Sequence, residues 1–577
     1  MTSSPGGLLL VMAVMVPFVG VLAGFALGGR KAQHVAMVTI IAGFCIALAI
    51  ASESIRSGAT ISYLLGGWAP PLGIALRADG LAVVMMLAIA VVIVGIGVYA
   101  RSGFATPPGV RESRAALTFW TLLLAIWGAL NLVFVSGDLF TLYVALELLT
   151  FAAVPLVSLD GRAETLRAAL RYLLYALLGS ILYLLGAVLV YGAYGTLDMA
   201  LLAERVRADP ATLTAAALMT AGLLAKTALV PLHLWLPPAH AGAPPAASAV
   251  LSGLVVKGSW FLIVRLWFDV LPGVVTAPAA QLLAGLGAAA ILLGNVVALR
   301  QQRLKLLVAY STLAQIGYLF LMFPLAFDAG AAALERGTAL AGGTLQAISH
   351  AMAKAAMFMA AGLIYKALGH DRIAGFAGVG RALPLTVLTF ALAGLALMGL
   401  PPSGAFVAKK LLLDAAAASG QWWWDLVMQA GGLLTASYVV LVLAQALTPA
   451  AAPVRPQEPV SRVAEIAAFA LALCSLLLGF VTATVPALSD VLASALKPSE
   501  LVAVLVLASG GVLLAVALAD RLPTWCDGAG VRALRRTTVA PALAFARLDG
   551  ALRRWPVAGF SLLAVAIALG VAMIAGR

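Results

Sequence analysis

Charged side chains are scarce in this sequence. Only 10% of its 577 residues are charged and 63% are hydrophobic, whereas an ordinary soluble domain carries about 25% charged residues. A single soluble core cannot bury so much apolar surface at this length. The scarcity of charge therefore excludes a soluble globular protein and predicts a chain whose main solvent is lipid.

Cofactor and metal motifs are also missing. The three cysteines, Cys45, Cys474 and Cys526, are too far apart in the sequence for a metal or redox motif. No GxGxxG, P-loop, iron–sulfur, haem or flavin signature is present, so we predict no cofactor and no metal in this chain. The driving energy is then expected to come from an ion gradient or from partner subunits.

Long apolar runs recur along the chain and predict an all-α polytopic membrane protein, since about 20 apolar residues span a bilayer. The sixteen predicted spans are 8–28, 34–51, 80–100, 115–136, 138–158, 166–194, 212–239, 244–267, 276–299, 305–325, 341–365, 383–415, 421–447, 462–486, 500–519 and 557–575. No Lys or Arg precedes Arg30, so the first run is expected to be a retained helix and not a signal peptide.

Lysine and arginine fall mainly in alternate loops. Loops after odd-numbered helices, together with the adjoining helix ends, hold 23 of 30 basic residues, and the loops and ends on the other side hold seven. The positive-inside rule then predicts a multi-pass protein of the cell inner membrane, with the odd-to-even loops in the cytoplasm and both termini on the other side. This topology accounts for the net charge of +13, and no nucleic-acid partner is predicted.

The segment 521–556 combines seven arginines with apolar side chains such as Trp525 and Phe545. We expect an amphipathic stretch along the cytoplasmic face, attracted to anionic lipid or to a neighbouring subunit. A basic surface loop without a partner is the alternative.

Ionisable side chains inside the predicted helices are the strongest functional signal. A charge at the centre of a bilayer costs at least ~2.5–3.5 kcal/mol, so such residues usually mark an ion pathway. The candidates for proton translocation are Glu147, Lys226, Lys257, His350, Lys354 and Lys409. His350 and Lys354 are four residues apart and share one helical face, whereas Lys410 faces a different side from its neighbour Lys409.

A static ion pair that fixes helix packing is the alternative for Glu147 and Lys226. It does not account for three further lysines and a histidine, which have too few carboxylates to match. Excess buried lysine requires neutral amines or a hydrated path, and both suit proton transfer. The polar side chains that are candidates for holding connecting water are Ser311, Thr312, Gln315 and Ser349. Each is equally suited to hydrogen bonding between helices.

Prolines predict that two helices are broken at membrane depth. Pro231 and Pro237 interrupt the seventh helix, and Pro401 and Pro402 interrupt the twelfth. Backbone groups freed at such breaks are tolerated only against protein or water, and matched breaks in two halves are typical of inverted-repeat transporters. The breaks lie five helices apart and predict two inverted repeats, helices 4–8 and 9–13. Ordinary proline kinks are the alternative.

The predicted organisation has four parts. Helices 1–3 occupy residues 1–110, the first repeat occupies 111–270, and the second repeat occupies 271–450. Residues 451–577 hold helices 14–16 together with the basic segment.

Several segments resemble the antiporter-like subunits, a family that includes the D-type subunit of Mrp sodium/proton antiporters, the L-, M- and N-type subunits of complex I, and counterparts in membrane-bound hydrogenases. The segments are SGDLFTLYVALELL, VYGAYGTLDMALLAE, KTALVPLHLWLPPAHAGAPPAASAVLSGLVVKG, SHAMAKAAMFMAAG and GLPPSGAFVAKKLLL, within about residues 75–450. The resemblance looks closest to the D-type Mrp protein and implies a proton-translocating member of a multisubunit complex.

The resemblance also implies roles for the charged residues. Glu147 and Lys226 match a gating pair, Lys257 matches the central lysine, His350 with Lys354 match a relay, and Lys409 matches the terminal group. These residues would carry protons from the cytoplasm to the other side through two half-channels.

One departure leaves a question open. Several relatives carry an acidic residue at the position of Pro238, so the group that takes up protons from the cytoplasm in the first half-channel is not identified.

Three alternatives remain. The chain could serve a complex I-like or hydrogenase-like redox complex or an inorganic-carbon uptake complex, in which any enzymatic chemistry would belong to partners. It could be a non-conducting scaffold, or a self-sufficient Na⁺/H⁺ exchanger. We assign protons to this chain and Na⁺ to partners, because sodium sites need carboxylates and carbonyls and Glu147 is the main mid-membrane carboxylate.

Overall fold

The computed structural model describes residues 3–107, 109–328, 330, 333–450, 452–482, 502, 506, 509–515 and 529–577, with backbone alone for 529–539. Among the described helices, 13 are long and apolar enough to cross a membrane. The prediction of an all-α polytopic membrane protein is therefore confirmed. The predicted seventh and twelfth spans are each divided into two shorter helices, and most of the predicted span 500–519, together with Cys526, lies outside the described residues.

The N-terminal part packs three long helices beside a small hairpin. Its elements are α1 (Gly7–Leu27), α2 (Gly29–Ser57), β1 (Ile61–Leu64), η1 (Leu65–Gly67), β2 (Ala75–Ala78) and α3 (Gly80–Ala100). The strands pair antiparallel, with Ile61 opposite Ala78. No pattern in the sequence predicts this hairpin, because each strand is only four residues long.

The first repeat region contains a broken helix and a helix with π-helical turns. Its elements are α4 (Arg114–Val135), α5 (Leu139–Val157), α6 (Ala163–Tyr194), α7 (Met199–Arg205), α8 (Pro210–Thr227), α9 (Leu236–Gly242), α10 (Pro245–Val250), η2 (Leu251–Val255), α11 (Val256–Arg265) and η3 (Leu266–Val270). The last four form one continuous helix, in which η2 and η3 are π-helical. Such π-turns often occur at functional sites.

The second repeat region has the same order of elements as the first: three long helices, then a broken helix, then a further long helix. Its elements are α12 (Ala277–Leu299), α13 (Leu304–Leu325), α14 (Thr338–Leu368), η4 (Ile373–Gly375), α15 (Val379–Ala382), α16 (Pro384–Met398), α17 (Gly404–Ala418) and α18 (Trp422–Leu447). The described helices that follow are α19 (Arg462–Thr482), α22 (Ala529–Leu552) and α23 (Trp555–Ala575). The short α15 and α7 lie in connections between the long helices.

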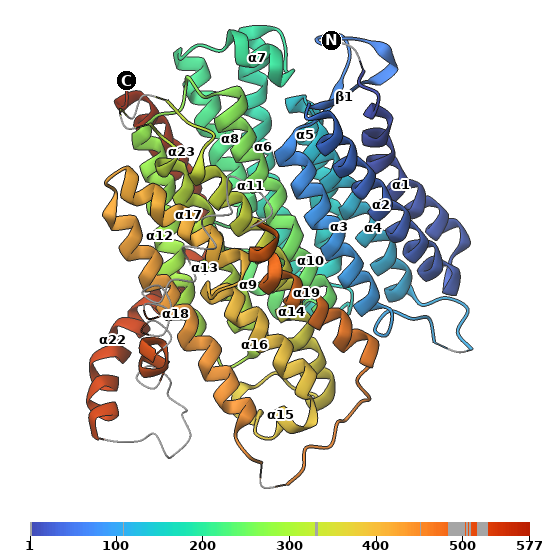
Figure 1. Ribbon diagram of the computed structural model, residues 1–577, viewed down its shortest axis with the longest axis vertical. Helices are drawn as coiled ribbons and strands as arrows, with labels where there is room; N and C mark the ends of the chain where they lie inside the picture. The colour runs from blue at the N-terminus through green and yellow to red at the C-terminus, as the bar shows by residue number, and fades with distance from the viewer. Residues whose placement is uncertain are drawn as a thin grey trace.

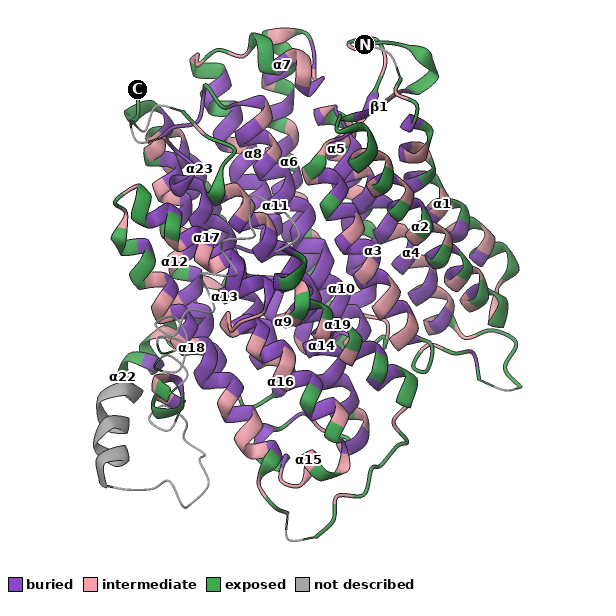
Figure 2. Cartoon of the chain, viewed as in Figure 1, coloured by how far each residue is buried: buried purple, intermediate pink, exposed green. Residues whose placement is uncertain are grey.

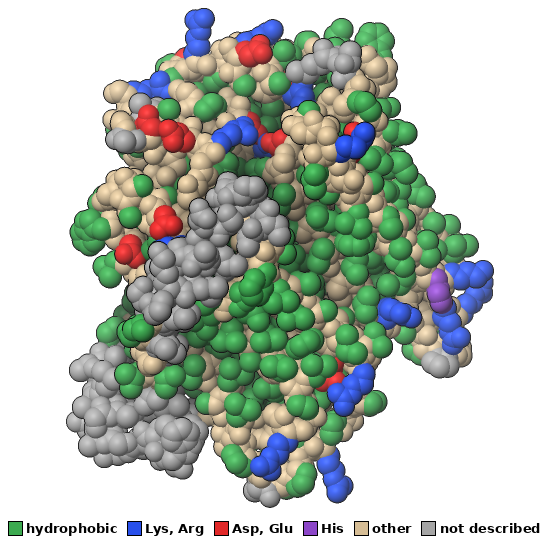
Figure 3. All heavy atoms as spheres, viewed as in Figure 1, with side chains coloured by type: hydrophobic (Ala, Val, Ile, Leu, Met, Phe, Trp, Pro, Cys, Tyr) green, Lys and Arg blue, Asp and Glu red, His purple; other side chains and the backbone are tan. Residues whose placement is uncertain are grey.

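The bundle has two distinct ends. Figure 1 shows β1, α7 and both chain termini at one end, and α15 at the other. We call the end with α15 and the loops 158–162 and 300–303 the basic face, and the other end the opposite face. Figure 3 shows many hydrophobic side chains across the middle of the visible surface, beside the atoms drawn in grey, as expected for a protein that crosses a membrane.

Aspartates begin several helices at the opposite face. The side chains of Asp79, Asp138, Asp198 and Asp209 each accept a hydrogen bond from a backbone amide in the first turn of α3, α5, α7 and α8. These amides have no partner inside the helix, so an N-terminal carboxylate stabilises the helix start.

Backbone bridges mark matching positions in the two repeat regions. Asp138, before α5, pairs with Asp198, after α6. Arg303, before α13, pairs with Arg372, after α14. The first bridge lies at the opposite face and the second at the basic face, because the helices concerned are five crossings apart. This arrangement supports the predicted inverted repeats, whose boundaries stay a prediction.

The helices that carry the central lysines occupy the interior, as Figure 2 shows for α10, α11 and α14. Every residue in the most apolar stretch of α10–η3 and of α14 is buried, and nearly every one in α13. By contrast, α1, α2 and α6 expose many apolar side chains. The candidate ion pathway therefore runs where the chain itself excludes lipid.

Candidate functional site

The first helix break begins at a residue in the left-handed conformation. Ala228 ends α8 with φ 60°. Its amide donates to the carbonyl of Ala225 at 3.2 Å, and the amide of Leu229 donates to Leu224 at 3.2 Å. Pro231 follows inside the non-helical stretch between α8 and α9. Proline has no amide hydrogen, so inside a continuous helix Pro231 would remove one backbone hydrogen bond. In the non-helical break no such bond is lost.

Pro237 has a different role from Pro231. It lies in the first turn of α9, where proline loses no helical hydrogen bond. Pro237 therefore starts the second half of the broken helix, and Pro231 lies inside the break.

The second break repeats this geometry. Gly399 ends α16 with φ 75°. Its amide donates to Ala396 at 3.0 Å, and the amide of Leu400 donates to Leu395 at 3.2 Å. Two prolines follow, and Ser403 caps α17. Because both halves end on the same hydrogen-bond pattern, the breaks are matched features and not independent proline kinks.

Side chains satisfy the backbone carbonyls near each break. The indole Nε1–H of Trp235 donates to the carbonyl of Ala225 at 3.0 Å. The amide of Gln315 donates to the carbonyl of Leu397 at 3.3 Å. Buried carbonyls at a helix end need such donors in the absence of water. Gln315, predicted as a water-holding residue, therefore also supports the second break.

The predicted pair of Glu147 and Lys226 is present. Lys226 Nζ lies 3.3 Å from Glu147 Oε1 and donates to Thr150 Oγ1 at 2.7 Å. The hydroxyl of Ser180 donates to Glu147 from α6. Lys226 occupies the last turn of α8, where helix carbonyls favour a positive charge. The pair thus joins α5 and α6 to the first break.

Lys257 and His350 form a direct contact at the centre of the bundle. Lys257 Nζ lies 2.8 Å from His350 Nδ1 and donates to the carbonyl of Ser252, in the π-helical η2, at 2.6 Å. Both side chains are fully buried. An ammonium donates to a neutral imidazole, and an imidazolium donates to a neutral amine, so one hydrogen bond serves both states. This contact is suited to passing a proton.

Lys354 continues the polar line along α14. Its Nζ donates to the hydroxyl of Ser311 and, at 3.3 Å, to the carbonyl of Val308. Farther along, the amide of Gln346 donates to Gln315 at 2.9 Å. Buried hydrogen-bonding groups on α13 and α14 therefore face each other over several turns.

Two of the predicted water-holding residues connect helices directly. Thr312 shares a hydrogen bond with Ser252 at 2.9 Å. Ser349 shares one with Ser475 of α19 at 3.1 Å. These hydroxyls act at least partly as links between helices, which was the alternative that the sequence left open.

Lys409 lies apart from this central line. Its Nζ is 3.4 Å from Gln429 Oε1, and Gln429 in turn donates to Asp425 at 3.2 Å. Within the described part of the chain no hydrogen bond joins it to Lys354. Lys410 pairs with Asp414 at 3.5 Å, which agrees with its exclusion from the predicted pathway.

Sequence reasoning missed two buried histidines beside the first break. His240 in α9 is fully buried, stacks on Phe358 with ring centroids 4.8 Å apart, and both its ring nitrogens lack a partner among the described residues. His233 falls between helices, where helical periodicity is uninformative, yet its Nε2 lies 2.9 Å from Asp549. The available signal was that both lie close to Trp235 and the prolines of the break.

An ion-pair cluster closes the opposite face of the first region. Arg265, the last residue of α11, donates to Asp79 at 2.5 Å and to Asp269 at 2.7 Å. Arg336 also contacts Asp269. Burial disfavours the charged form of Asp79, but hydrogen bonding and the charge of Arg265 outweigh burial and lower its pKa. A cavity of about 300 Å³ lies among these side chains.

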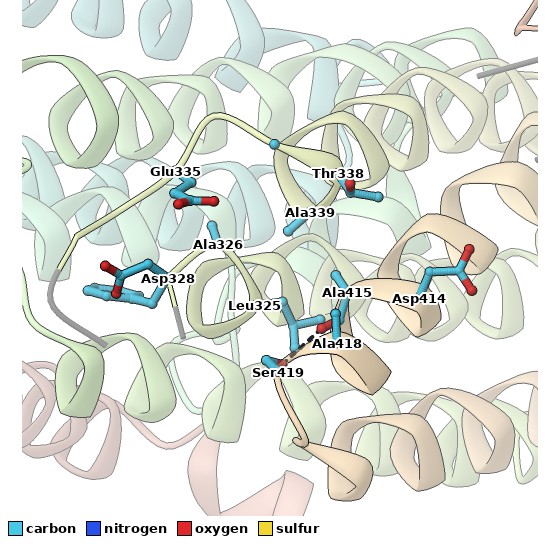
Figure 4. A pocket seen from close by; sticks show the side chains of 12 residues that line it. Leu325, Ala326, Asp328, Glu335, Thr338, Ala339, Asp414, Ala415, Ala418 and Ser419 are labelled. Atoms are coloured by element: carbon cyan, nitrogen blue, oxygen red, sulfur yellow. Dashed lines mark hydrogen bonds between the residues drawn. The ribbon is translucent and has the colours of Figure 1, made fainter. Parts of the chain in front are cut away.

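A second cavity at the opposite face has a different lining. It measures about 610 Å³ and lies between the end of α13, the start of α14 and the end of α17. Figure 4 shows Asp328, Glu335 and Asp414 around it. No lysine or arginine is among its lining residues in the described chain.

Comparisons with known proteins bear on the family of this chain. A family model described as "NADH:quinone oxidoreductase/Mrp antiporter, TM" matches residues 136–435. This range holds all six residues predicted for proton translocation.

Two relatives show long similarity. The N-type subunit of the NADH-quinone oxidoreductase of Desulforudis audaxviator is 32% identical over 462 residues, which are 78% of this chain and 87% of that protein. The D-type subunit of the Na⁺/H⁺ antiporter of Alkalihalophilus pseudofirmus is 30% identical over 439 residues, 74% of this chain and 84% of that one.

Two solved structures share the fold. A chain of the Mrp complex from Dietzia sp. superposes with a TM-score of 0.73 at 23% identity, covering 86% of this chain and 99% of that chain. A chain of the membrane-bound sulfane sulfur reductase, an archaeal respiratory membrane complex, superposes with a TM-score of 0.74 at 25% identity, covering 87% and 99%.

Proposed function

Because the chain belongs to the NADH:quinone oxidoreductase/Mrp antiporter family, we propose that it is a proton-translocating, antiporter-like membrane subunit of a multisubunit complex. The observation that carries this proposal is the buried contact between Lys257 and His350. Burying two basic groups together without a carboxylate partner is costly, and proton transfer gives the arrangement a use.

The proposed pathway uses both halves of the chain. A proton reaches Lys257 from the basic face through the region of the first break. It passes through His350 and Lys354 and leaves at the opposite face by way of Lys409. Water is needed between Lys354 and Lys409, which do not touch.

The pair of Glu147 and Lys226 acts as the gate in this scheme. At 3.3 Å and an effective dielectric of about 20, the attraction of two such charges is on the order of 5 kcal/mol. Opening the pair frees the Lys226 charge to repel a proton on the central line. An energy of this size suits control by an ion gradient or by a neighbouring subunit.

The basic face is proposed to be cytoplasmic, with both termini on the other side of the inner membrane. The support is the excess of lysine and arginine in the loops on that face. Protease accessibility of a tag at either terminus, in right-side-out and inverted vesicles, tests this orientation.

A non-conducting scaffold is the second candidate. A scaffold has no use for lysines inside the membrane-spanning bundle, and here four of them, Lys226, Lys257, Lys354 and Lys409, all meet polar partners. Their retention favours a conducting subunit.

The class of complex is the finer part of the proposal. Relatives bear names of an Mrp-type antiporter and of respiratory complexes. Purification of the tagged chain in mild detergent, with mass spectrometry of its partners, separates them. Small hydrophobic partners indicate an Mrp-type antiporter and Na⁺-linked proton flux, iron–sulfur partners indicate a redox complex, and a soluble partner without redox centres indicates carbon uptake.

Proton flux in liposomes containing the purified complex and a pH-sensitive dye tests translocation itself. We expect Lys257→Ala to lower the initial rate by at least about tenfold, the equivalent of 1.4 kcal/mol. Lys410→Ala is the matched control, because Lys410 pairs with Asp414 away from the central line. A wild-type rate for Lys257→Ala in an intact complex would exclude the proposed pathway.

A further inference from the structure

A carboxylate near the end of α22 is buried against the first helix break. Asp549 is only 2% exposed. Its Oδ1 lies 2.9 Å from Nε2 of His233, in the break, and its Oδ2 accepts from the hydroxyl of Tyr310, in α13, at 2.7 Å. Arg553 pairs with it at 2.8 Å. The sequence predicted an amphipathic segment lying along a face, whereas here its end reaches the interior.

The hydrogen bonds fix which ring nitrogen of His233 is free. Tyr310 and Arg553 donate to Asp549, which is held as a carboxylate and can only accept. His233 therefore carries a hydrogen on Nε2, and in the neutral ring Nδ1 is the acceptor. That Nδ1 is fully buried and has no partner among the described residues. A buried acceptor without a hydrogen-bond donor lowers the stability of the fold, so its presence calls for an explanation such as a functional role.

The surroundings of His233 in the sequence lack any carboxylate. Residues 228–244 contain no Asp or Glu. The negative charge beside His233 instead arrives from a helix more than 300 residues later in the chain. Only one of the two buried histidines of this region is supplied with a carboxylate, since His240 has no partner in the described chain.

We propose that Asp549 is a positioning residue, which pairs with His233 to form a proton-loading dyad on the basic-face side of the first half-channel. This inference rests on the proposed function and names the group that takes up the proton. Carboxylate–histidine pairs orient the ring, fix its tautomer and stabilise its protonated form.

The loading step conserves protons. Water from the basic face gives a proton to Nδ1, while Nε2 keeps its hydrogen bonded to Asp549. The same proton then leaves Nδ1 for a water or amine deeper in the half-channel. With a neutral ring, Asp549 and Arg553 cancel in charge; after loading, the cluster carries one positive charge. Arg553 therefore opposes loading and Asp549 favours it.

Because Asp549 and Arg553 carry opposite charges, removing each of them should shift the protonation of His233 in opposite directions. Histidine C2 hydrogen–deuterium exchange with mass spectrometry reports the titration of His233 in the intact complex, and dye-monitored flux between pH 6 and 9 reports its use. Asp549→Asn is expected to move both profiles to lower pH by about one to three units, the usual effect of removing a paired charge. Arg553→Gln is expected to move them to higher pH.

Arg547→Gln is the matched control, since it removes the same charge from an exposed site on the same helix. Lower melting temperature for Asp549→Asn with unshifted profiles would mean that the carboxylate only fixes α22, and would overturn the proposal. If that variant does not assemble, an unshifted Arg553→Gln overturns it. Lys257→Ala separates failure of the dyad from failure of the proposed function. If Lys257→Ala loses proton flux while Asp549→Asn keeps wild-type pH profiles, only the dyad is rejected. If Lys257→Ala keeps wild-type flux, the proposed function is rejected.

Discussion

The two repeat regions share a broken helix but hold their lysines in different ways. In the first, Lys226 lies 3.3 Å from the carboxylate of Glu147. In the second, Lys409 meets the neutral amide of Gln429 at 3.4 Å, and Lys354 meets the neutral hydroxyl of Ser311. An ion pair has two states of different energy, open and closed, whereas a neutral partner tolerates either protonation state. This difference fits the proposed pathway, in which the first region switches and the second conducts.

The two cavities at the opposite face also differ in the charges of their lining side chains. The first region closes its cavity with the arginine–aspartate pairs around Arg265. The second region lines its larger cavity with the carboxylates of Asp328, Glu335 and Asp414, of which Asp414 pairs with Lys410 at 3.5 Å. A fixed negative potential concentrates cations near a pathway end. This difference supports proton release through the second region.

The largest expected effect comes from removing the switch. Glu147→Gln deletes the carboxylate charge and leaves Lys226 with Thr150 as its main partner. We expect proton flux to fall by about 100-fold, which corresponds to about 2.7 kcal/mol and is within the energy of a close charge pair. The assay is dye-monitored flux in liposomes containing the complex.

Ser180→Ala is the control for this experiment, because it removes a hydrogen bond to Glu147 without changing charge. Its effect is expected to stay below about fivefold, the value of one ordinary hydrogen bond. Equal losses in the two variants would show that the pair is a packing clamp.

A smaller effect is expected from giving the second region a switch that it lacks. Gln429→Glu places a carboxylate beside Lys409, which then holds its proton more tightly. Because Lys409 is only partly buried, solvent screening limits the gain, and we expect flux to slow by about tenfold, or 1.4 kcal/mol. Raising the pH on the release side should recover part of the rate.

Gln429→Ala distinguishes charge from contact at the same position. It removes the amide that Lys409 touches but adds no charge, so its flux should stay nearer to wild type. If both variants slow flux equally, the neutral character of this partner is unimportant and the contrast between the regions fails.

Intramembrane charge and proline position predicted much of this site from sequence. The pairing of Glu147 with Lys226 and the position of both breaks follow from rare residue types at membrane depth. The contact of Lys257 with His350 also joins two predicted residues. These features are visible in sequence because each departs strongly from an apolar background.

The remaining features depend on tertiary contacts that no local pattern encodes. Asp549 lies in a segment whose composition indicates a surface, and its partner His233 is far away in the chain. The π-helical turns on either side of α11, which carries Lys257, and the left-handed conformation of Ala228 have no signal in the local sequence. Alanine has no intrinsic preference for that conformation, so nothing in the residue type itself predicts it.

The smallest predicted effect tests whether the two breaks are equivalent. Ala228 and Gly399 occupy the same left-handed position, with φ 60° and 75°. A Cβ on Gly399 meets only ordinary contacts, the nearest being Lys409 Cδ at 3.6 Å. The difference between the residues is therefore conformational, a strain of about 1–2 kcal/mol for alanine, reduced by the greater chain entropy of unfolded glycine, about 0.4–1 kcal/mol.

We expect Ala228→Gly to stabilise the chain and Gly399→Ala to destabilise it, each by about 0.5–1 kcal/mol. Thermal unfolding of the purified complex should show opposite shifts of about 1–2 °C, and the double variant should return to the wild-type melting temperature. If both variants shift the melting temperature in the same direction, contacts around Ala228 stabilise its left-handed conformation and no equivalent contacts act on Gly399. The two halves would then differ in their backbones as well as in their charges.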